Sequence, residues 1–278
     1  MLLITGASGG LGSLVARRLA GRPDVRFGTR APAGGEGGGE TGAGQVRVDF
    51  DDPDSLGPAF AGVDTLLLIS AGYGEDDRVI ARHGAAVAAA ERAGVRHLVY
   101  TSLTGTGDHL PYALPHRWTE RRLRESSLTW TVLRNGLYAE LLAALAAPGP
   151  DGLITAPLGT GRLAAVARED LAEVAVRVAL APQAHAGQVY ELVGDRALGG
   201  AELAGAVGAR YAPGSLSEAR AVLAGTAAQP FEVPMLVATY SAIAAGFLDT
   251  PDAGVLPKLL DRAPRSALSV YAESVPRA

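Results

Sequence analysis

Three glycines near the start of the chain have the spacing needed to bind a phosphate group. Gly6, Gly9 and Gly12 follow an apolar run at residues 1–4 and open a helix-like stretch. Glycine permits a tight strand-to-helix turn and lets backbone N–H groups approach a pyrophosphate, which the positive end of the helix then faces. This segment is therefore predicted to bind a dinucleotide. The expected contacts from this turn are Gly6, Ser8, Gly9, Gly10, Leu11 and Gly12.

The ends of the next strand-like runs bear on which dinucleotide binds. An Asp or Glu after the second run would accept hydrogen bonds from a ribose 2′-hydroxyl, but Arg30 stands there. A guanidinium suits a 2′-phosphate, so NADP(H) is predicted, the alternative being a surface arginine at a loop entrance. Asp49 either accepts from the adenine amino group or caps a turn. The remaining cofactor contacts are expected from Phe50, Ser70, Ala71, Thr101 and Ser102.

Four polar residues in later segments are candidates for assisting a hydride transfer: Ser102, Tyr112, His116 and Asn135. Each can donate a hydrogen bond to an oxygen that gains charge in the reaction. The alternatives are a hydrogen-bonded strand-end hydroxyl for Ser102 and a helix-start imidazole, packed on Trp118 or solvated, for His116. The residues expected to line the substrate site are Gly72, Asn135 and Tyr138, although Tyr138 could also belong to the core.

Strand-like and helix-like segments alternate along the chain and must position these residues. The alternation predicts an α/β fold, a Rossmann-like doubly wound parallel sheet with a small, mainly helical C-terminal substrate lobe. The strands are expected at residues 1–5, 25–29, 46–49, 65–69, 97–101, 130–134 and 189–192. The helices between them are expected at residues 11–20, 78–93, 117–125 and 169–179.

The chain is expected to contain two domains. Residues 1–195 form the nucleotide-binding domain, residues of about 137–162 contribute to the substrate lobe, and residues 196–278 form the rest of that lobe. The lobe would close over the carboxyl ends of the strands, where open α/β sheets bind ligands. Its expected helices lie at residues 201–210, 217–224 and 234–245, with no further strand. The Gly- and Pro-rich segment at residues 31–45 is expected to be a mobile loop.

Composition excludes several classes of protein. The 278 residues include no cysteine, so a disulfide framework, a thiol nucleophile and a cysteine-bound metal are excluded, and no metal site is predicted. A net charge of −4 argues against a nucleic-acid partner. The apolar runs are too short for a membrane span, and without a recognisable signal peptide a cytoplasmic location is expected. A homodimer is compatible with the sequence, which does not determine the oligomeric state. The arginines expected to form a solvated helix face are Arg117, Arg121, Arg122 and Arg124.

The chain resembles the short-chain dehydrogenase/reductase superfamily and, within it, the atypical NmrA-like group, which uses the same glycine spacing. It is most similar to the bacterial NAD(P)H:quinone oxidoreductases of the second type. The resemblance implies NADPH-dependent reduction of quinones, and the lack of a recognisable flavin motif favours direct hydride transfer. One departure is Arg121, where that subgroup has a lysine. The similar segments lie at residues 66–70, 93–95, 100–103, 116–120, 131–138 and 189–194.

The proton-donating pair of ordinary members of this superfamily is absent. Those enzymes use Tyr-x-x-x-Lys, in which the lysine lowers the tyrosine pKa. The single lysine here, Lys258, has Gly254 four residues before it, so this pair cannot form. Tyr112 and His116 have the same spacing and could substitute. A quinone is less demanding than a ketone, because its reduction gives a delocalised anion of low basicity instead of an alkoxide.

Three functions from different classes remain open. The first is an NADPH-dependent quinone oxidoreductase acting on a small-molecule acceptor. The second is a reductase of an aromatic or polyketide-type ketone, in which His116 or Tyr112 gives the proton. The third is a non-catalytic NADP(H) sensor that binds a protein partner, because fold alone does not determine function.

Overall fold

A computed structural model of the protein describes residues 1–32, 44–71, 73–226, 229–251 and 254–276. Its main feature is a seven-stranded sheet in the order β3-β2-β1-β4-β5-β6-β9. The pairs β1–β2, β1–β4, β2–β3 and β4–β5 are parallel. All seven predicted strands are confirmed, with small differences at their ends. They are β1 (Leu2–Ile4), β2 (Val25–Thr29), β3 (Gln45–Arg47), β4 (Thr65–Leu68), β5 (His97–Leu103), β6 (Thr129–Asn135) and β9 (Val189–Leu192).

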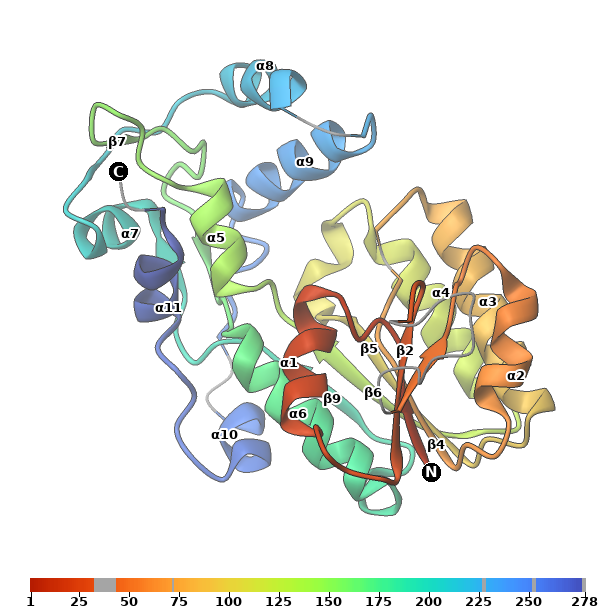
Figure 1. Ribbon diagram of the computed structural model, residues 1–278. Coiled ribbons are helices and arrows are strands. Elements are labelled where there is room, and N and C mark those ends of the chain that lie inside the picture. The colour runs from red at the N-terminus through yellow and green to blue at the C-terminus, as the bar shows by residue number, and fades with distance from the viewer. Residues whose placement is uncertain (33–43, 72, 227–228, 252–253, 277–278) are drawn as a thin grey trace. The chain divides into compact units, whose positions relative to one another are not determined.

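Helices cover both faces of this sheet, which confirms the doubly wound architecture. Figure 1 shows α1 and α6 on one face and α2, α3 and α4 on the other. Four of these helices fall in predicted helical segments, whereas the short α2 was not predicted. Their bounds are α1 (Gly10–Arg18), α2 (Leu56–Phe60), α3 (Asp76–Arg92), α4 (Ala113–Arg124) and α6 (Arg168–Leu180).

The central strands are buried along their whole length because both faces of the sheet are covered. The four residues of β4 and the seven residues of β5 are all buried. Leu66 and Leu68 pack in one cluster with Phe60 of α2 and with apolar residues of α3. Burying a side chain of this size contributes about 1.5–3 kcal/mol relative to leaving it exposed. The core therefore fixes the strands, and with them the loops that leave their carboxyl ends.

The chain divides into two compact units. Unit 1 consists of Met1–Ser102, Leu114–Arg134 and Leu171–Tyr190. Unit 2 consists of Leu103–Ala113, Asn135–Asp170 and Glu191–Ala278. Unit 2 thus takes more of the chain than the segments predicted for the substrate lobe. The reason is that the chain leaves the sheet after β5, β6 and β9, and each excursion adds to unit 2.

Unit 2 has its own apolar core, in which Leu142 of α5 packs with Ile243 of α9 and Tyr271 of α11. The three helices predicted for this region are present, and α5, α10 and α11 are additional. The helices of unit 2 are α5 (Ala139–Leu145), α7 (Gly200–Ala206), α8 (Leu216–Thr226), α9 (Glu232–Ala244), α10 (Val255–Leu260) and α11 (Ala267–Ser274).

The expectation of no strand after residue 194 is wrong. β10 (Leu198–Gly199) pairs with β8 (Arg162–Leu163), and β11 (Arg210–Tyr211) pairs with β7 (Leu153–Ile154). These two-residue strands are too short to show an alternating apolar pattern, so the sequence carries no local signal for them. The predicted mobile loop at 31–45 falls largely on residues 33–43, outside the described residues.

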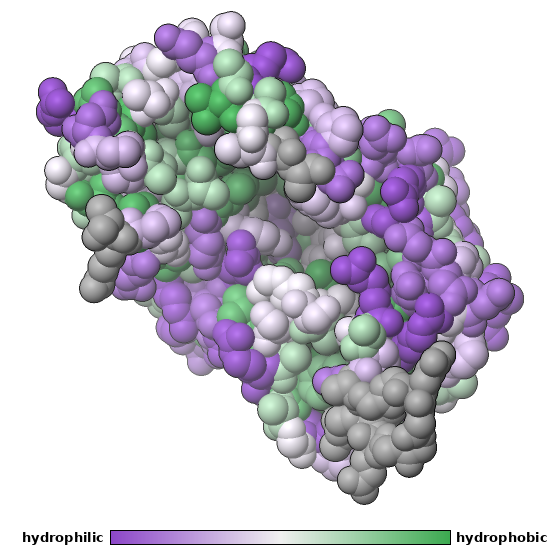
Figure 2. All heavy atoms as spheres, turned by 45° about the horizontal axis from the view of Figure 1, so that its top comes forward, coloured by the Kyte–Doolittle hydropathy of each residue, from purple (hydrophilic) through white to green (hydrophobic). Residues whose placement is uncertain are grey.

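Exposed apolar side chains come from separate elements. Among the most exposed are Val222 of α8, Tyr73 in the loop before α3, and Phe247 just after α9. On the face drawn in Figure 2, hydrophilic and hydrophobic residues are interspersed. The predicted homodimer stays a prediction. No helix within the described ranges combines the length and the apolar character needed to cross a membrane.

Candidate active site

The glycine-rich turn between β1 and α1 is built for close approach. Gly6 has φ of +62°, in the left-handed region that favours glycine. Gly9 precedes the helix, and its N–H donates to the Gly6 carbonyl at 2.9 Å. A Cβ on Gly12 would lie 2.0 Å from that carbonyl oxygen, so only glycine fits there. The first turn of α1 contains no acidic residue, and its positive end is thus suited to phosphate groups.

The segment after β4 is held by side chains from three other elements. Thr5 Oγ1 accepts a hydrogen bond from the Ile69 N–H at 3.0 Å. Thr101 Oγ1 accepts one from the Ser70 N–H at 2.9 Å. His83 Nε2, on α3, accepts one from the Ala71 N–H at 3.0 Å. The predicted cofactor-contacting residues Ser70 and Ala71 are therefore fixed in place. Gly72, predicted to line the substrate site, lies outside the described residues.

A small cavity of about 220 Å³ lies at the carboxyl end of β3, lined by Phe50, Asp51, Pro53, Arg78, Ala81 and Arg82. Arg82 binds Asp51 with two hydrogen bonds, of 2.8 and 2.7 Å. These bonds, together with the charges of Arg82, Arg78 and Arg30, keep the pKa of Asp51 below its usual value. Because the charges of three guanidinium groups act on one carboxylate, the surroundings of Asp51 favour an anionic group.

Asp49, beside this cavity, has a structural role in the turn. Its Oδ1 accepts a hydrogen bond from the Asp51 N–H at 3.1 Å, and its own N–H donates to Ser55 Oγ at 3.0 Å. This contact corresponds to the turn-capping alternative. Its predicted contact with adenine stays a prediction, as does the contact of Phe50.

Replacing Arg30 with alanine is expected to raise the Kd for NADPH about tenfold to a hundredfold and leave the Kd for NADH nearly unchanged. The reason is that a charge-assisted contact with a phosphate contributes about 1.5–3 kcal/mol. Calorimetric titration of both cofactors measures this change. Arg22→Ala is the matched control, because Arg22 is a surface arginine paired with Asp24 at 2.9 Å. An unchanged ratio of the two constants in Arg30→Ala would remove the 2′-phosphate role.

A buried chain of polar groups leads from the loop after β4 to His116. His83 Nδ1 lies 2.8 Å from Thr119 Oγ1, and the Thr119 hydroxyl donates to the Pro115 carbonyl at 2.7 Å. Thr119 therefore accepts from His83 Nδ1–H, which leaves His83 Nε2 unprotonated to accept from Ala71. Burial lowers the pKa of His83 to about 3, so this imidazole is neutral at physiological pH.

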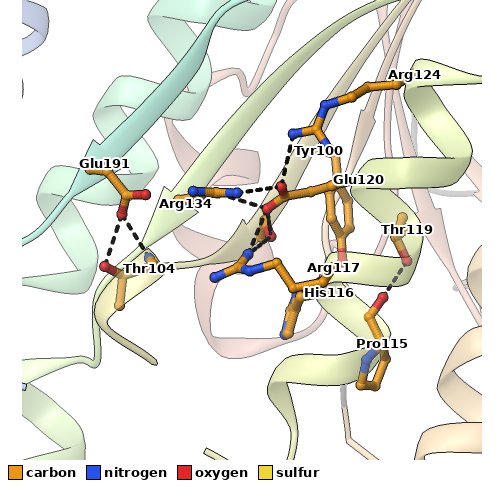
Figure 3. A network of polar contacts seen from close by, with 12 residues as sticks. Tyr100, Thr104, Pro115, His116, Arg117, Thr119, Glu120, Arg124, Arg134 and Glu191 are labelled. Carbon is orange, nitrogen blue, oxygen red and sulfur yellow. Dashed lines mark hydrogen bonds and ion pairs between the residues drawn. The ribbon is translucent and has the colours of Figure 1, made fainter. Parts of the chain in front are cut away.

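Burial decides the charge states of Tyr100 and His116, both labelled in Figure 3. The Tyr100 hydroxyl lies 2.9 Å from His116 Nδ1. Burial raises the pKa of Tyr100 far above its usual value and lowers that of His116 to about 4, so both groups are neutral. The Tyr100–His116 hydrogen bond exists in two forms, with the imidazole as donor or as acceptor at Nδ1. In the form in which Tyr100 donates to Nδ1, the His116 proton is on Nε2, at the opposite side of the ring, and can be donated in a hydrogen bond.

Ser102 belongs to a charged network around Glu120, a side chain that is 1% exposed. Figure 3 shows Glu120 between Arg117, Arg124 and Arg134. Glu120 binds Arg117 at 2.6 Å and Arg134 at 2.7 Å, and the Ser102 hydroxyl donates to it at 2.7 Å. Burial alone would raise the pKa of Glu120, but the bonds from Arg134 and Ser102 and the charge of Arg117 lower it overall. Ser102 is thus a hydrogen-bonded hydroxyl near the end of β5. This environment corresponds to the structural alternative to its predicted role in hydride transfer.

The predicted solvated arginine face of α4 is wrong for two of its four members. Arg117 contacts Glu120 and Arg122 binds Glu91 of α3, and both side chains are half-buried. Arg121 and Arg124 are exposed, as expected; they pair along the helix with Glu125 and Glu120. The side chains that face the core were misassigned because the partners come from α3, β5 and β6.

The candidates in unit 2 have separate environments. The Tyr112 hydroxyl lies 3.3 Å from Thr239 Oγ1, and Thr239 donates to the Met235 carbonyl, so Tyr112 donates to Thr239. Burial raises the pKa of Tyr112. Asn135 ends β6 and is buried, and Tyr138 is half-buried with the Arg168 guanidinium over its ring. Within the described residues no group of three or more His, Asp or Glu side chains is placed to hold a metal.

Sequence reasoning missed three residues of these clusters: His83, Glu120 as a buried carboxylate, and Arg168. A signal existed for His83, because it falls on the apolar face of α3 together with Val79 and Val87. A polar residue on such a face is buried and needs partners. Arg168 has no comparable local signal.

The chain is similar in sequence to an NAD(P)H-binding family and to two named reductases. The model of a family described as NAD(P)H-binding matches residues 6–182. Quinone oxidoreductase 2 of Escherichia coli (strain K12) is 36% identical over 203 residues, which cover 71% of this chain and 70% of that protein. The NAD(P)H azoreductase of Xenophilus azovorans is 31% identical over 240 residues and 81% of each chain.

A solved structure is similar to this protein over nearly the whole chain. The crystal structure of an NADPH-dependent quinone oxidoreductase from Escherichia coli, complexed with NADPH, matches with a TM-score of 0.84 and 31% identity. The match covers 98% of this chain and 99% of that one. The fold and the glycine turn define a dinucleotide-binding oxidoreductase of the Rossmann type. The chain belongs to the NAD(P)H-binding family, and the predicted resemblance, fold class and cofactor class are confirmed.

Proposed function

We propose that this protein transfers a hydride from NADPH to a quinone-like small-molecule acceptor. NADPH, when bound, supplies the hydride. The chain supplies the glycine turn for the pyrophosphate, the arginines around Asp51 for the 2′-phosphate, and the fixed loop after β4. A tight glycine turn at the start of a helix and the positive charges around Asp51 fit this cofactor. The names of the relatives, a quinone oxidoreductase and an azoreductase, support an acceptor with a conjugated π-system.

The observation that favours a quinone over a ketone is the neutral state of His116. Its pKa of about 4 means that it is not an imidazolium at neutral pH and is a weak proton donor to an alkoxide. Its Nε2–H can still donate a hydrogen bond, which is sufficient for the delocalised anion that forms from a quinone. In the tautomer proposed here, the Tyr100 hydroxyl, 2.9 Å away, donates to Nδ1.

The test is NADPH oxidation at 340 nm with the purified protein. We expect turnover with 1,4-benzoquinone and 1,4-naphthoquinone and none with an aromatic polyketide-like ketone. Turnover with the ketone alone would support the ketone reductase. Tight binding of NADPH without turnover of any acceptor would support the sensor, and either result would overturn the proposal.

Replacing His116 with alanine is expected to lower kcat for 1,4-naphthoquinone about tenfold or more, because one hydrogen bond to the developing charge is lost. His116→Gln is expected to recover part of this loss, since its amide keeps an N–H near the position of Nε2. Stopped-flow reduction measured between about pH 6 and 8 should show no titration of His116, whose pKa lies near 4. Equal rates in wild type and His116→Ala would mean that His116 is structural.

A further inference from the structure

The backbone after β4 runs beside the glycine turn within unit 1. Thr5, which precedes that turn, accepts a hydrogen bond from the Ile69 N–H at 3.0 Å. A Cβ on Gly6 would lie 3.8 Å from the Ile69 Cβ. In open α/β sheets a ligand binds at the carboxyl ends of the strands, where these two segments meet. The next two residues, Ser70 and Ala71, therefore lie where the cofactor is expected.

His83 on α3 holds this backbone through an acceptor that exists in only one form of the ring. The Ala71 N–H donates to His83 Nε2 at 3.0 Å. A backbone amide can only donate, so Nε2 carries no proton, and the proton of the neutral imidazole is on Nδ1. The His83 side chain is fully buried, and this burial lowers its pKa to about 3, which keeps the ring neutral.

Thr119 on α4 supplies the acceptor for the proton on Nδ1. Its Oγ1 lies 2.8 Å from His83 Nδ1, and its own hydroxyl donates to the Pro115 carbonyl at 2.7 Å (Figure 3). Because its single proton is directed to Pro115, Thr119 accepts from the ring. The Tyr100 hydroxyl, 3.4 Å from the same nitrogen, is the more distant alternative. Contacts at opposite sides of the ring thus select the same tautomer.

Packing alone does not require a histidine at this position. His83 lies on the buried face of α3 with Val79 and Val87, where an apolar side chain would fill the space without loss of hydration. The preceding residue, Arg82, also binds the backbone after β4, because its Nη1 donates to the Tyr73 carbonyl at 3.1 Å. Consecutive residues of α3 therefore hold this backbone, one through an acceptor and one through a donor.

We propose that His83 is a positioning residue for the cofactor, and that in the tautomer set by Thr119 it holds the Ala71 backbone in the conformation that binds NADP(H). In the opposite tautomer, Nε2–H would face the Ala71 N–H, and two donors cannot bond, so the backbone would have to move. Thr119 thus acts on cofactor binding through His83. The proposal rests on the cofactor class and on the predicted contacts of Ser70 and Ala71, and not on which acceptor is reduced.

Thr119→Val tests the tautomer without changing the ring or the loop. Valine has nearly the shape of threonine but offers no acceptor to Nδ1–H. Calorimetric titration should show a Kd for NADP⁺ raised about threefold to tenfold, and Thr119→Ser, which keeps the hydroxyl, should restore the wild-type value. Nitrogen-15 NMR of the His83 imidazole should show one tautomer in the wild type and a mixture in Thr119→Val, a signal that a merely structural threonine would not change.

His83→Leu tests the contact with Ala71 itself. This variant is expected to raise the Kd for NADP⁺ about tenfold, because the Ala71 N–H loses its acceptor. His83→Gln should recover most of this loss, since its side-chain oxygen can accept near the position of Nε2. Hydrogen exchange of the Ala71 amide should become faster in His83→Leu and return towards the wild-type rate in His83→Gln.

Unit 1 offers a matched control in a second buried pair of histidine and threonine. His97 Nε2 lies 2.8 Å from Thr131 Oγ1, and the Thr131 hydroxyl donates to the His185 carbonyl at 2.8 Å. His97 is the first residue of β5, whereas the cofactor is expected at the carboxyl ends of the strands. His97→Leu and Thr131→Val should therefore lower the thermal-unfolding midpoint about as much as the test variants do, and leave the Kd for NADP⁺ unchanged.

The proposal is overturned if folded Thr119→Val and His83→Leu bind NADP⁺ as the wild type does, or if the control variants weaken binding by the same factor. An unchanged tautomer in Thr119→Val would overturn the role of Thr119. Circular dichroism checks folding, and the comparison of His83→Gln with Thr119→Val serves if His83→Leu does not fold. Because no acceptor is present in these titrations, failure to reduce a quinone would overturn the proposed function alone.

Discussion

Gly12→Ala is expected to weaken NADP⁺ binding at least about a hundredfold. The added Cβ would lie 2.0 Å from the Gly6 oxygen and 2.7 Å from the Gly6 carbonyl carbon, and both are backbone atoms that cannot rotate away. Either α1 or the turn must move, and the turn then no longer presents its N–H groups to the pyrophosphate. Forcing an extra methyl group into such a contact costs about 1–3 kcal/mol in stability as well. Calorimetric titration and thermal unfolding measure the two effects.

Gly205→Ala is the matched control for this change. Gly205 lies in α7, and a Cβ there meets no atom of another segment within 4 Å. Since alanine is a better helix former than glycine, this variant is expected to gain about 0.5–1 kcal/mol of stability and to bind NADP⁺ normally. Binding of NADP⁺ by Gly12→Ala with wild-type affinity would show that the turn is not the pyrophosphate site.

The glycine turn and the strands were predictable because their signals are local. Gly6, Gly9 and Gly12 sit between a strand and a helix within one short segment, so spacing alone indicates their use. β4 and β5 are buried on both faces, and each contains a run of consecutive apolar residues that is visible in the sequence. Such patterns depend on neighbours in the chain and not on distant partners.

The network of Glu120 was not predictable for the opposite reason. Along α4, this glutamate is surrounded by arginines and looks like part of a solvated surface. Its burial depends on Arg134, at the end of β6, and on Ser102, on β5. A carboxylate can be buried only where such partners meet it, and the tertiary fold decides where that is. The same holds for His116, whose partner is Tyr100 of β5.

The partners of His116 also change what it can do. A histidine at the start of a helix is compatible with a solvated imidazole of ordinary pKa that works as an acid. In the fold it is placed against Tyr100, in a desolvated environment that lowers its pKa to about 4. The residue type predicted proton chemistry, whereas burial limits it to hydrogen-bond donation at neutral pH.

Acidification from about pH 6.5 to 4 is expected to destabilise the protein strongly. Burial strongly lowers the pKa of three histidines from 6.5, to about 3 for His83 and to about 4 for His97 and His116, and it also lowers that of the less buried His185. In this window the unfolded chain binds protons that the folded protein does not, so stability falls as the pH falls through 6.5 towards the folded pKa values. Each buried imidazole lowers the free energy of unfolding by on the order of 3 kcal/mol over this pH window. The sum of these losses is comparable with a typical stability of about 5–15 kcal/mol.

Urea unfolding at pH 7.5, 6.5, 5.5 and 5 measures this slope before most carboxylates titrate. Glu120 and Asp51, whose pKa values are lowered in the folded protein, add their own loss of stability only at lower pH. His97→Gln isolates one imidazole, because His97 binds Thr131 at 2.8 Å in unit 1 and has no part in the candidate site. This variant should reduce the slope by about a third, since one of three comparable protonations is removed. A slope equal to that of the wild type would mean that His97 is not buried in its neutral form.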